Sequence, residues 1–230
     1  MSGHYNYSKF ENTIPNYIKI YDIPIVIANS NNIKDYGRFV NDFENEQVIN
    51  IPWTREKKLI FKNGEYRYTR ELDKNSGKEA LPTHGIFKSY YDDNYFYSEN
   101  TSVDNGKYII GVKPKNEKNN YFYTSEMNYH DCGGQVIMNK NKEPFLLLLS
   151  KADDFIKPED SILFYFDGTL GFQIYPKIWH QPMYPLTIKN KNIIAYNKQC
   201  SVHSSCTVNF VQEFNTILRI NMDYKLISKL

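Results

Sequence analysis

Two segments of the chain carry the residue types that perform chemistry. Residues 128–135 read Asn-Tyr-His-Asp-Cys-Gly-Gly-Gln, and residues 171–182 read Gly-Phe-Gln-Ile-Tyr-Pro-Lys-Ile-Trp-His-Gln-Pro. Alternate residues of a strand point to the same face, so Asn128 and His130 are predicted to share one face. Histidine titrates near neutral pH, which suits it to act as a general acid, a general base or a metal ligand. We therefore predict a site centred on His130 and His180.

The two segments resemble the metal-binding motif of cupins, in which one strand carries His-x-His with an acidic residue five positions later and a later strand supplies a third His. Asn128, His130, Gln135 and His180 stand at these four positions. The resemblance implies a divalent metal ion with His130, Gln135 and His180 as its ligands. Neutral imidazoles bind zinc, nickel, copper or iron, whereas an amide is a weaker ligand. The structural alternative is a buried histidine that hydrogen-bonds a backbone carbonyl. We favour that alternative for His84 and His203, and the functional interpretation for His130 and His180.

Three further residues beside the histidines have two interpretations each. Trp179 is equally suited to packing and to a substrate platform. Lys177 is suited to binding a carboxylate or to a solvated turn. Cys132 is expected to be an inert thiol, because nothing in the sequence indicates the lowered pKa that a nucleophilic cysteine needs.

The elements that must position these residues are short strands separated by Pro, Gly and Asn turns. A short helix is expected over residues 31–41, and the leucine run 146–149 is expected to be a buried strand. The other segments that read as strands are 18–21, 23–28, 48–53, 84–91, 95–98, 108–112, 121–124, 134–138, 161–166, 172–175, 185–188, 203–210 and 216–220. Strands of this length and spacing are typical of a small barrel or jelly roll.

Composition limits the classes of function. The 230 residues are 41% hydrophobic and include 20 Tyr and 14 Phe, enough for a sizeable core. The net charge of +2 gives no sign of a nucleic-acid partner. The three cysteines have no metal-site spacing. Their odd, low count favours a reducing compartment. Since the longest apolar run, residues 145–149, is far too short to span a bilayer, we predict a soluble cytoplasmic protein without a membrane partner.

The two segments resemble the ureidoglycolate lyase family of cupins. The residues that carry the resemblance are Glu126, His130, Gly133, Gln135, Asp153, Asp154, Gly171, Trp179, His180 and Pro182. The resemblance extends over about residues 80–220. It implies an all-β fold: a cupin-type double-stranded β-helix, or jelly-roll barrel, with an N-terminal extension and few short helices. The chain is then one domain over 1–230, in which 1–80 form strands and loops that extend the barrel and 81–222 form the core.

The resemblance also implies a reaction. Members of the family split ureidoglycolate into glyoxylate and urea by collapse of a carbinolamine. By this resemblance the catalytic residues are His130, His180 and Gln135. The implied substrate-binding residues are Asn128, Tyr175, Lys177 and Trp179. The expected partner is a small ureido or oxo acid, and the expected assembly is a homodimer.

Departures from the family pattern keep a second function open. Ile174 and Tyr175 stand where many members have Tyr and His or another polar residue. The arginine that many members carry upstream has Lys113 or Lys115 as its nearest counterpart, and a lysine is a point charge rather than a bidentate fork. The alternative is therefore a catalytically decayed cupin-fold protein that binds a ligand, or a structural subunit that self-associates.

Overall fold

Two large β-sheets make up most of the computed structural model, which confirms the predicted all-β class. The structure describes residues 6–50, 60–62, 65–67, 82–92, 94–101, 106–130, 133–153, 155–186, 192–200 and 205–223. Its helical elements are short: η1 (Tyr7–Phe10), η3 (Pro158–Asp160) and α1 (Phe210–Phe214). Within these ranges no helix has the length and apolar character needed to cross a bilayer.

The larger sheet has ten strands. In spatial order they are β1 (Lys19–Asp22), β19 (Thr216–Asn221), β9 (Tyr121–Thr124), β8 (Gly106–Val112), β7 (Tyr95–Asn100), β6 (Pro82–Asp92), β17 (Asn192–Cys200), β11 (Gln135–Asn139), β14 (Gly171–Ile174) and β3 (Gly37–Val40). All neighbours in this sheet are antiparallel except β1 and β19, which run parallel.

The smaller sheet has seven strands. Along its main path they are β18 (Ser205–Asn209), β10 (Glu126–His130), β15 (Trp179–His180), β12 (Phe145–Ser150), β13 (Ile162–Phe166) and β2 (Ile25–Ile27), and β16 (Tyr184–Pro185) pairs with β12. A separate two-stranded sheet holds β4 (Ile60–Lys62) and β5 (Glu65–Arg67). Strands β1, β2 and β3 therefore add edges to both large sheets, so the N-terminal region is built into the same body as the rest.

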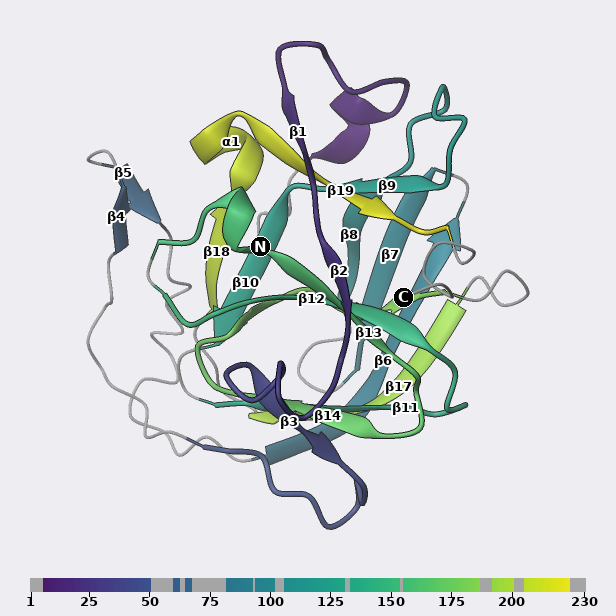
Figure 1. Ribbon diagram of the computed structural model, residues 1–230, viewed down its shortest axis with the longest axis vertical. Coiled ribbons are helices and arrows are strands. Elements are labelled where there is room, and N and C mark those ends of the chain that lie inside the picture. The colour runs from purple at the N-terminus through teal and green to yellow at the C-terminus, as the bar shows by residue number, and fades with distance from the viewer. Residues whose placement is uncertain are drawn as a thin grey trace.

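Strand β12 lies between two hydrophobic cores. Figure 1 shows β12 and β13 across the middle of the molecule, with β9 and β19 above them and β11 and β14 below. Leu146 and Leu148 pack in one core with residues of β19, β9 and β7. Leu147 and Leu149 pack in a second core with residues of β11 and β14. All six residues of β12 are buried, which confirms the predicted buried strand. Because the long sheet curls around it, β12 is a middle layer with no solvent face.

The helix predicted over residues 31–41 is wrong. The stretch forms turns through residue 36 and then strand β3, which pairs with β14. Ile33 and Tyr36 are buried in the second core, so their spacing reflects tertiary packing. A Cβ atom added at Gly37 would lie only 2.0 Å from the carbonyl oxygen of Gln173. Glycine is a poor helix former, and here it allows two backbones to approach closely.

Candidate functional site

The two histidines predicted to form a site lie side by side. In the smaller sheet β10 pairs with β15 so that Asn128 is opposite His180. The ring centroids of His130 and His180 are 5.1 Å apart, with an interplanar angle of 68°. Met127 and Tyr129 point into the first core, so by strand alternation Asn128 and His130 face the other side of β10. The structure thus brings His130 and His180, called the histidine pair below, together with Asn128 on one face.

A backbone contact fixes the orientation of the His180 ring. Its Nδ1 lies 2.8 Å from the carbonyl oxygen of Ile178, and the residue is buried, with 6% exposed. A carbonyl oxygen can only accept, so Nδ1 carries the hydrogen and donates it. The neutral ring then has its lone pair on Nε2. Hydrogen bonds of this kind orient catalytic and metal-bound histidines in many proteins.

A backbone hydrogen bond joins His130, at the end of β10, to the turn that precedes His180. The backbone N–H of Lys177 donates to the carbonyl oxygen of His130 at 2.9 Å. Lys177 has a φ of 67°, in the left-handed region, and is exposed. Tyr175 is partly buried against the second core, and its N–H donates to the carbonyl oxygen of Tyr36 at 3.0 Å. The turn therefore brings the backbone of Lys177, an exposed residue, to the backbone of His130.

Trp179, predicted to bind substrate, faces away from the histidine pair. It is fully buried in the first core, where its ring meets that of Tyr129 edge to face at 4.5 Å. Its Nε1 donates to the carbonyl oxygen of Asp153 at 2.7 Å. Neighbouring residues on a strand point to opposite faces, so the indole and the His180 ring lie on opposite sides of β15. The structure thus assigns the indole to packing.

Gln135 lies on the other sheet, in a row of buried amides. Its Nε2 donates to Asn197 Oδ1 at 2.9 Å, and Asn197 Nδ2 donates to Gln199 Oε1 at 2.9 Å. We call Gln135, Asn197 and Gln199 the amide row. Ile137, two residues after Gln135, packs in the second core, and so does Leu149, the residue opposite His180. The side chains of the amide row and of His180 therefore face the same space between the two sheets.

Two members of this row, Asn197 and Gln199, were not predicted from the sequence. Asn197 and Gln199 are buried, with 0% and 4% exposed, and they continue the inward face that Ile193 and Ala195 begin. The period-two spacing of Ala195, Asn197 and Gln199 was the available signal. This signal was missed because Asn and Gln residues in a chain rich in Asn are expected to lie at the surface.

A buried carboxyl group lies on the same strand face as the histidine pair. Glu126 is 7% exposed and is two positions before Asn128. Asn209 Nδ2 donates to Glu126 Oε1 at 3.1 Å. Gln181 donates through its Nε2 to the backbone carbonyl of Glu126. These contacts connect β10 to β18 and to the segment after β15. They therefore hold β10, the strand that carries His130, in place.

The described residues include two imidazoles as candidate metal ligands, those of the histidine pair. None of the described residues form a group of three or more His, Cys, Asp or Glu side chains able to hold a metal ion. Two imidazoles are one ligand short of the three protein ligands that catalytic zinc sites use. Cys132 and His203, considered above, lie outside the described residues. The metal remains a prediction, and no chemical step below depends on it.

Comparison with known proteins adds no relative. No family model matches the chain. No curated protein matches it either. The resemblance to ureidoglycolate lyases therefore rests on the two motifs alone.

Proposed function

We propose that the protein is a small-molecule lyase of cupin type that acts on ureidoglycolate or a related ureido or oxo acid. The observation that carries this proposal is the histidine pair: two imidazoles 5.1 Å apart, one of them oriented by a backbone carbonyl. Two adjacent groups that titrate near neutral pH can divide the roles of acid and base between them. Carbinolamine collapse needs one group of each kind.

The proposed step balances in protons and electrons. His180 Nε2 takes the hydroxyl proton of the carbinolamine, and the O–H electron pair forms the new carbonyl group. The C–N bond breaks, its electron pair goes to the urea nitrogen, and protonated His130 delivers a proton to that nitrogen. The products are glyoxylate and urea. Each turnover leaves His180 protonated and His130 neutral, so proton exchange with solvent resets the pair.

Polar groups around the histidine pair suit the rest of such a substrate. Asn128 lies opposite His180 in the sheet, and Gln135 lies in the facing amide row. Amide side chains both donate and accept, as does a ureido group. Lys177 supplies an exposed ammonium at the neighbouring turn for a carboxylate. These residues would orient the substrate while the imidazoles move protons.

A coupled assay for glyoxylate tests the proposal. Wild type is expected to release glyoxylate from ureidoglycolate, and His180→Asn is expected to lower kcat by roughly 10²- to 10⁴-fold, the usual contribution of general acid–base catalysis. His84→Asn is the matched control, because His84 is exposed and lies on β6. Equal rates for His180→Asn and wild type would refute the role of the histidine pair.

A binding protein without turnover is the second candidate, and the amide row favours it. The Gln135 amide is already hydrogen-bonded to Asn197, as expected of a fixed recognition group. In this case glyoxylate or ureidoglycolate raises the melting temperature of the wild type, and no product forms.

A further inference from the structure

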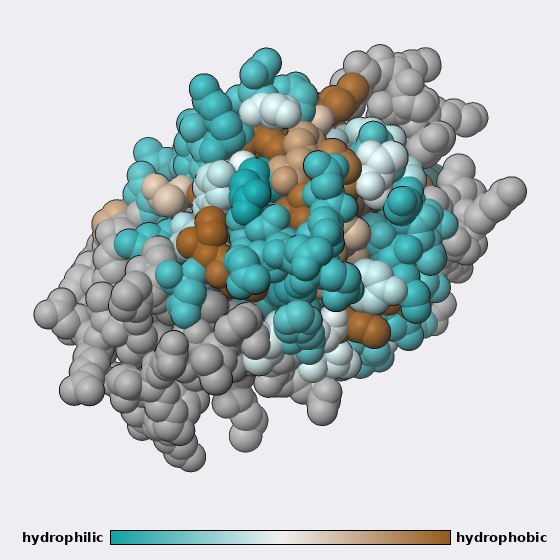
Figure 2. Space-filling model, turned by 90° about the horizontal axis from the view of Figure 1, so that it is seen from below, coloured by the Kyte–Doolittle hydropathy of each residue, from teal (hydrophilic) through white to brown (hydrophobic). Residues whose placement is uncertain are grey.

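A single segment covers the outer face of β11, β14 and β17. Residues 42–50, which we call the strap, follow β3 and run across these strands. Under the strap, Phe43 and Val48 pack on Val136 and Val40. Figure 2 shows the molecule from below, the side on which Figure 1 places β3 and β14, and the residues coloured there are mostly hydrophilic with small hydrophobic groups among them. The strap thus hides an apolar patch of the sheet.

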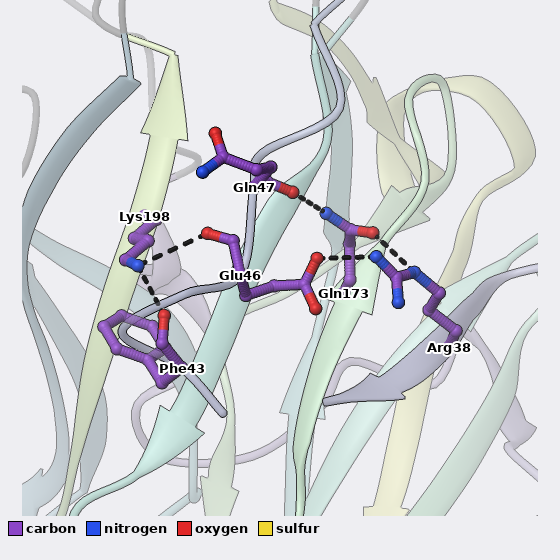
Figure 3. A network of polar contacts seen from close by, with 6 residues as sticks. All are labelled: Arg38, Phe43, Glu46, Gln47, Gln173 and Lys198. Atoms are coloured by element: carbon purple, nitrogen blue, oxygen red, sulfur yellow. Dashed lines mark hydrogen bonds and ion pairs between the residues drawn. The ribbon is translucent and has the colours of Figure 1, made fainter. Parts of the chain in front are cut away.

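A buried lysine holds the first half of the strap. Lys198 of β17 is only 2% exposed, and its Nζ donates to the carbonyl oxygens of Phe43, of Glu44 at 2.7 Å and of Glu46 at 3.3 Å. The Nζ also lies 4.6 Å from the centroid of the Phe43 ring. Figure 3 shows the ammonium between Phe43 and Glu46. An ammonium has three hydrogens to donate, and three carbonyl oxygens accept them here.

A series of side-chain hydrogen bonds holds the middle of the strap. Gln173 Nε2 donates to the carbonyl oxygen of Gln47 at 2.6 Å, and Arg38 Nε donates to Gln173 Oε1 at 3.0 Å. Arg38 also pairs with Glu46 at 2.5 Å. Figure 3 shows this second set of contacts beside the first. Since Arg38 is half exposed, its ion pair is worth less than the buried contacts of Lys198.

The end of the strap contacts two glycines that are close in sequence to His130. The N–H of Gly134 donates to the carbonyl oxygen of Ile49 at 2.8 Å, and Asn50 forms a bridge with Gly133. Gly133 is three residues after His130, whose carbonyl oxygen accepts the N–H of Lys177. The contacts of Lys198 with the strap, and of the strap with Gly133 and Gly134, therefore link Lys198 to positions three and four residues after His130.

We propose that Lys198 is a positioning residue for the histidine pair: its ammonium, enclosed by three strap carbonyls, fixes the strap against Gly133 and Gly134 and thereby sets the place of His130. This inference rests on the proposed function in one respect, that the histidine pair is the site. The ammonium acts as a tethered cation, because backbone carbonyls replace its hydration shell as they do for ions in channel filters. Without it, three carbonyl oxygens of the strap, that of Phe43 buried and those of Glu44 and Glu46 partly buried, lose this donor.

The test uses Lys198→Ala, which deletes three carbons and the ammonium, and follows amide hydrogen exchange in the full chain. The Gly134 amide is expected to exchange roughly 10- to 100-fold faster, the effect of losing one charged hydrogen bond. The Lys177 amide is expected to follow it, because its acceptor is on His130. The Leu163 amide of β13, which donates to the carbonyl oxygen of Pro24 just before β2, is the internal reference and should not change. Lys140→Ala, at an exposed lysine, is the matched control variant.

Chemical rescue separates positioning from general loss of structure. n-Propylammonium has the atoms that Lys198→Ala lacks, so it should restore slow exchange at Gly134 and Lys177, whereas n-propanol, of the same size without charge, should not. If Lys198→Ala does not fold, Lys198→Gln takes its place in the exchange comparison. Unchanged exchange at Gly134, or faster exchange at Gly134 alone with Lys177 unaffected, overturns the proposal.

Turnover distinguishes this inference from the proposed function. If wild type releases glyoxylate, Lys198→Ala should lower kcat and n-propylammonium should restore it. If wild type releases none, the lyase proposal fails, and the exchange and rescue measurements still decide the role of Lys198.

Discussion

The two-faced burial of β12 makes a sharp prediction about two neighbouring leucines. Leu147 and Leu148 are 1% and 0% exposed, but they belong to different cores on opposite sides of the strand. In a strand with one solvent face, substitution of one of two neighbours is nearly neutral. Here each of Leu147→Ala and Leu148→Ala should be severely destabilising.

The magnitude follows from the atoms removed. Truncating a fully buried leucine to alanine costs about 2–5 kcal/mol, the lost transfer free energy plus a term for the cavity. Because the two side chains pack in different cores, the double variant should lose about the sum of the single effects, apart from coupling through the backbone that adjacent residues share. The Ile27→Ala control, at a side chain 43% exposed on β2, should change stability by about 0.5 kcal/mol or less.

Urea unfolding of the five proteins (wild type, the two single variants, the double variant and the Ile27→Ala control), with the free energy taken from the midpoint and a shared slope, measures these differences. If Leu147→Ala or Leu148→Ala lies within about 0.5 kcal/mol of wild type, that side of β12 is not a core. The curled arrangement of the ten-stranded sheet would then be refuted.

Three other predictions concern single side chains. In urea unfolding, Ser98→Ala should be neutral or stabilising by about 1 kcal/mol, because the buried Ser98 hydroxyl has no hydrogen-bond partner within the described part of the chain. Ser150→Ala is the comparison and should cost about 1 kcal/mol, because the Ser150 hydroxyl donates to a backbone carbonyl at 2.7 Å. Burial, aided by a nearby carboxylate, raises the pKa of Tyr7, so the neutral phenol is favoured in the folded state and its stabilisation is present below the usual tyrosine pKa of about 10 and lost as pH rises above it. Between pH 10 and 11 the wild type should lose up to about 1.4 kcal/mol more than Tyr7→Phe, and parallel losses would contradict this. Trp179→Phe should cost about 2–4 kcal/mol in melting experiments through lost packing and the lost hydrogen bond to Asp153, with ligand affinity unchanged; weakened affinity would place the indole in the site.

The sequence predicted the parts of the fold that depend on local pattern. The leucine run of β12 and the strand class of the chain follow from apolar runs and turn residues. The segment around Ile33 and Tyr36 misled the helix prediction, because two buried residues three apart also occur in turns that pack on a core. The curl of the long sheet could not be predicted, since it depends on which strands pair across more than 100 residues, as β1 does with β19.

The candidate site was predicted in part for similar reasons. His130 and His180 were identified by type and by their place beside turns, and the sheet register then brought their rings together. Trp179 was ambiguous because its face depends on the register of β15. Lys198 gave no signal at all: only the path of the strap, set by tertiary contacts, makes that lysine different from the others in the chain.

Nuclear magnetic resonance of labelled histidine side chains tests the central claim most directly, namely that both imidazoles contact one bound small acid. On titration with glyoxylate, the ring signals of His130 and His180 should move together with one dissociation constant, while the signal of exposed His84 stays in place. Movement of only one of the two signals, or of neither at saturating glyoxylate, would contradict a shared site for the histidine pair.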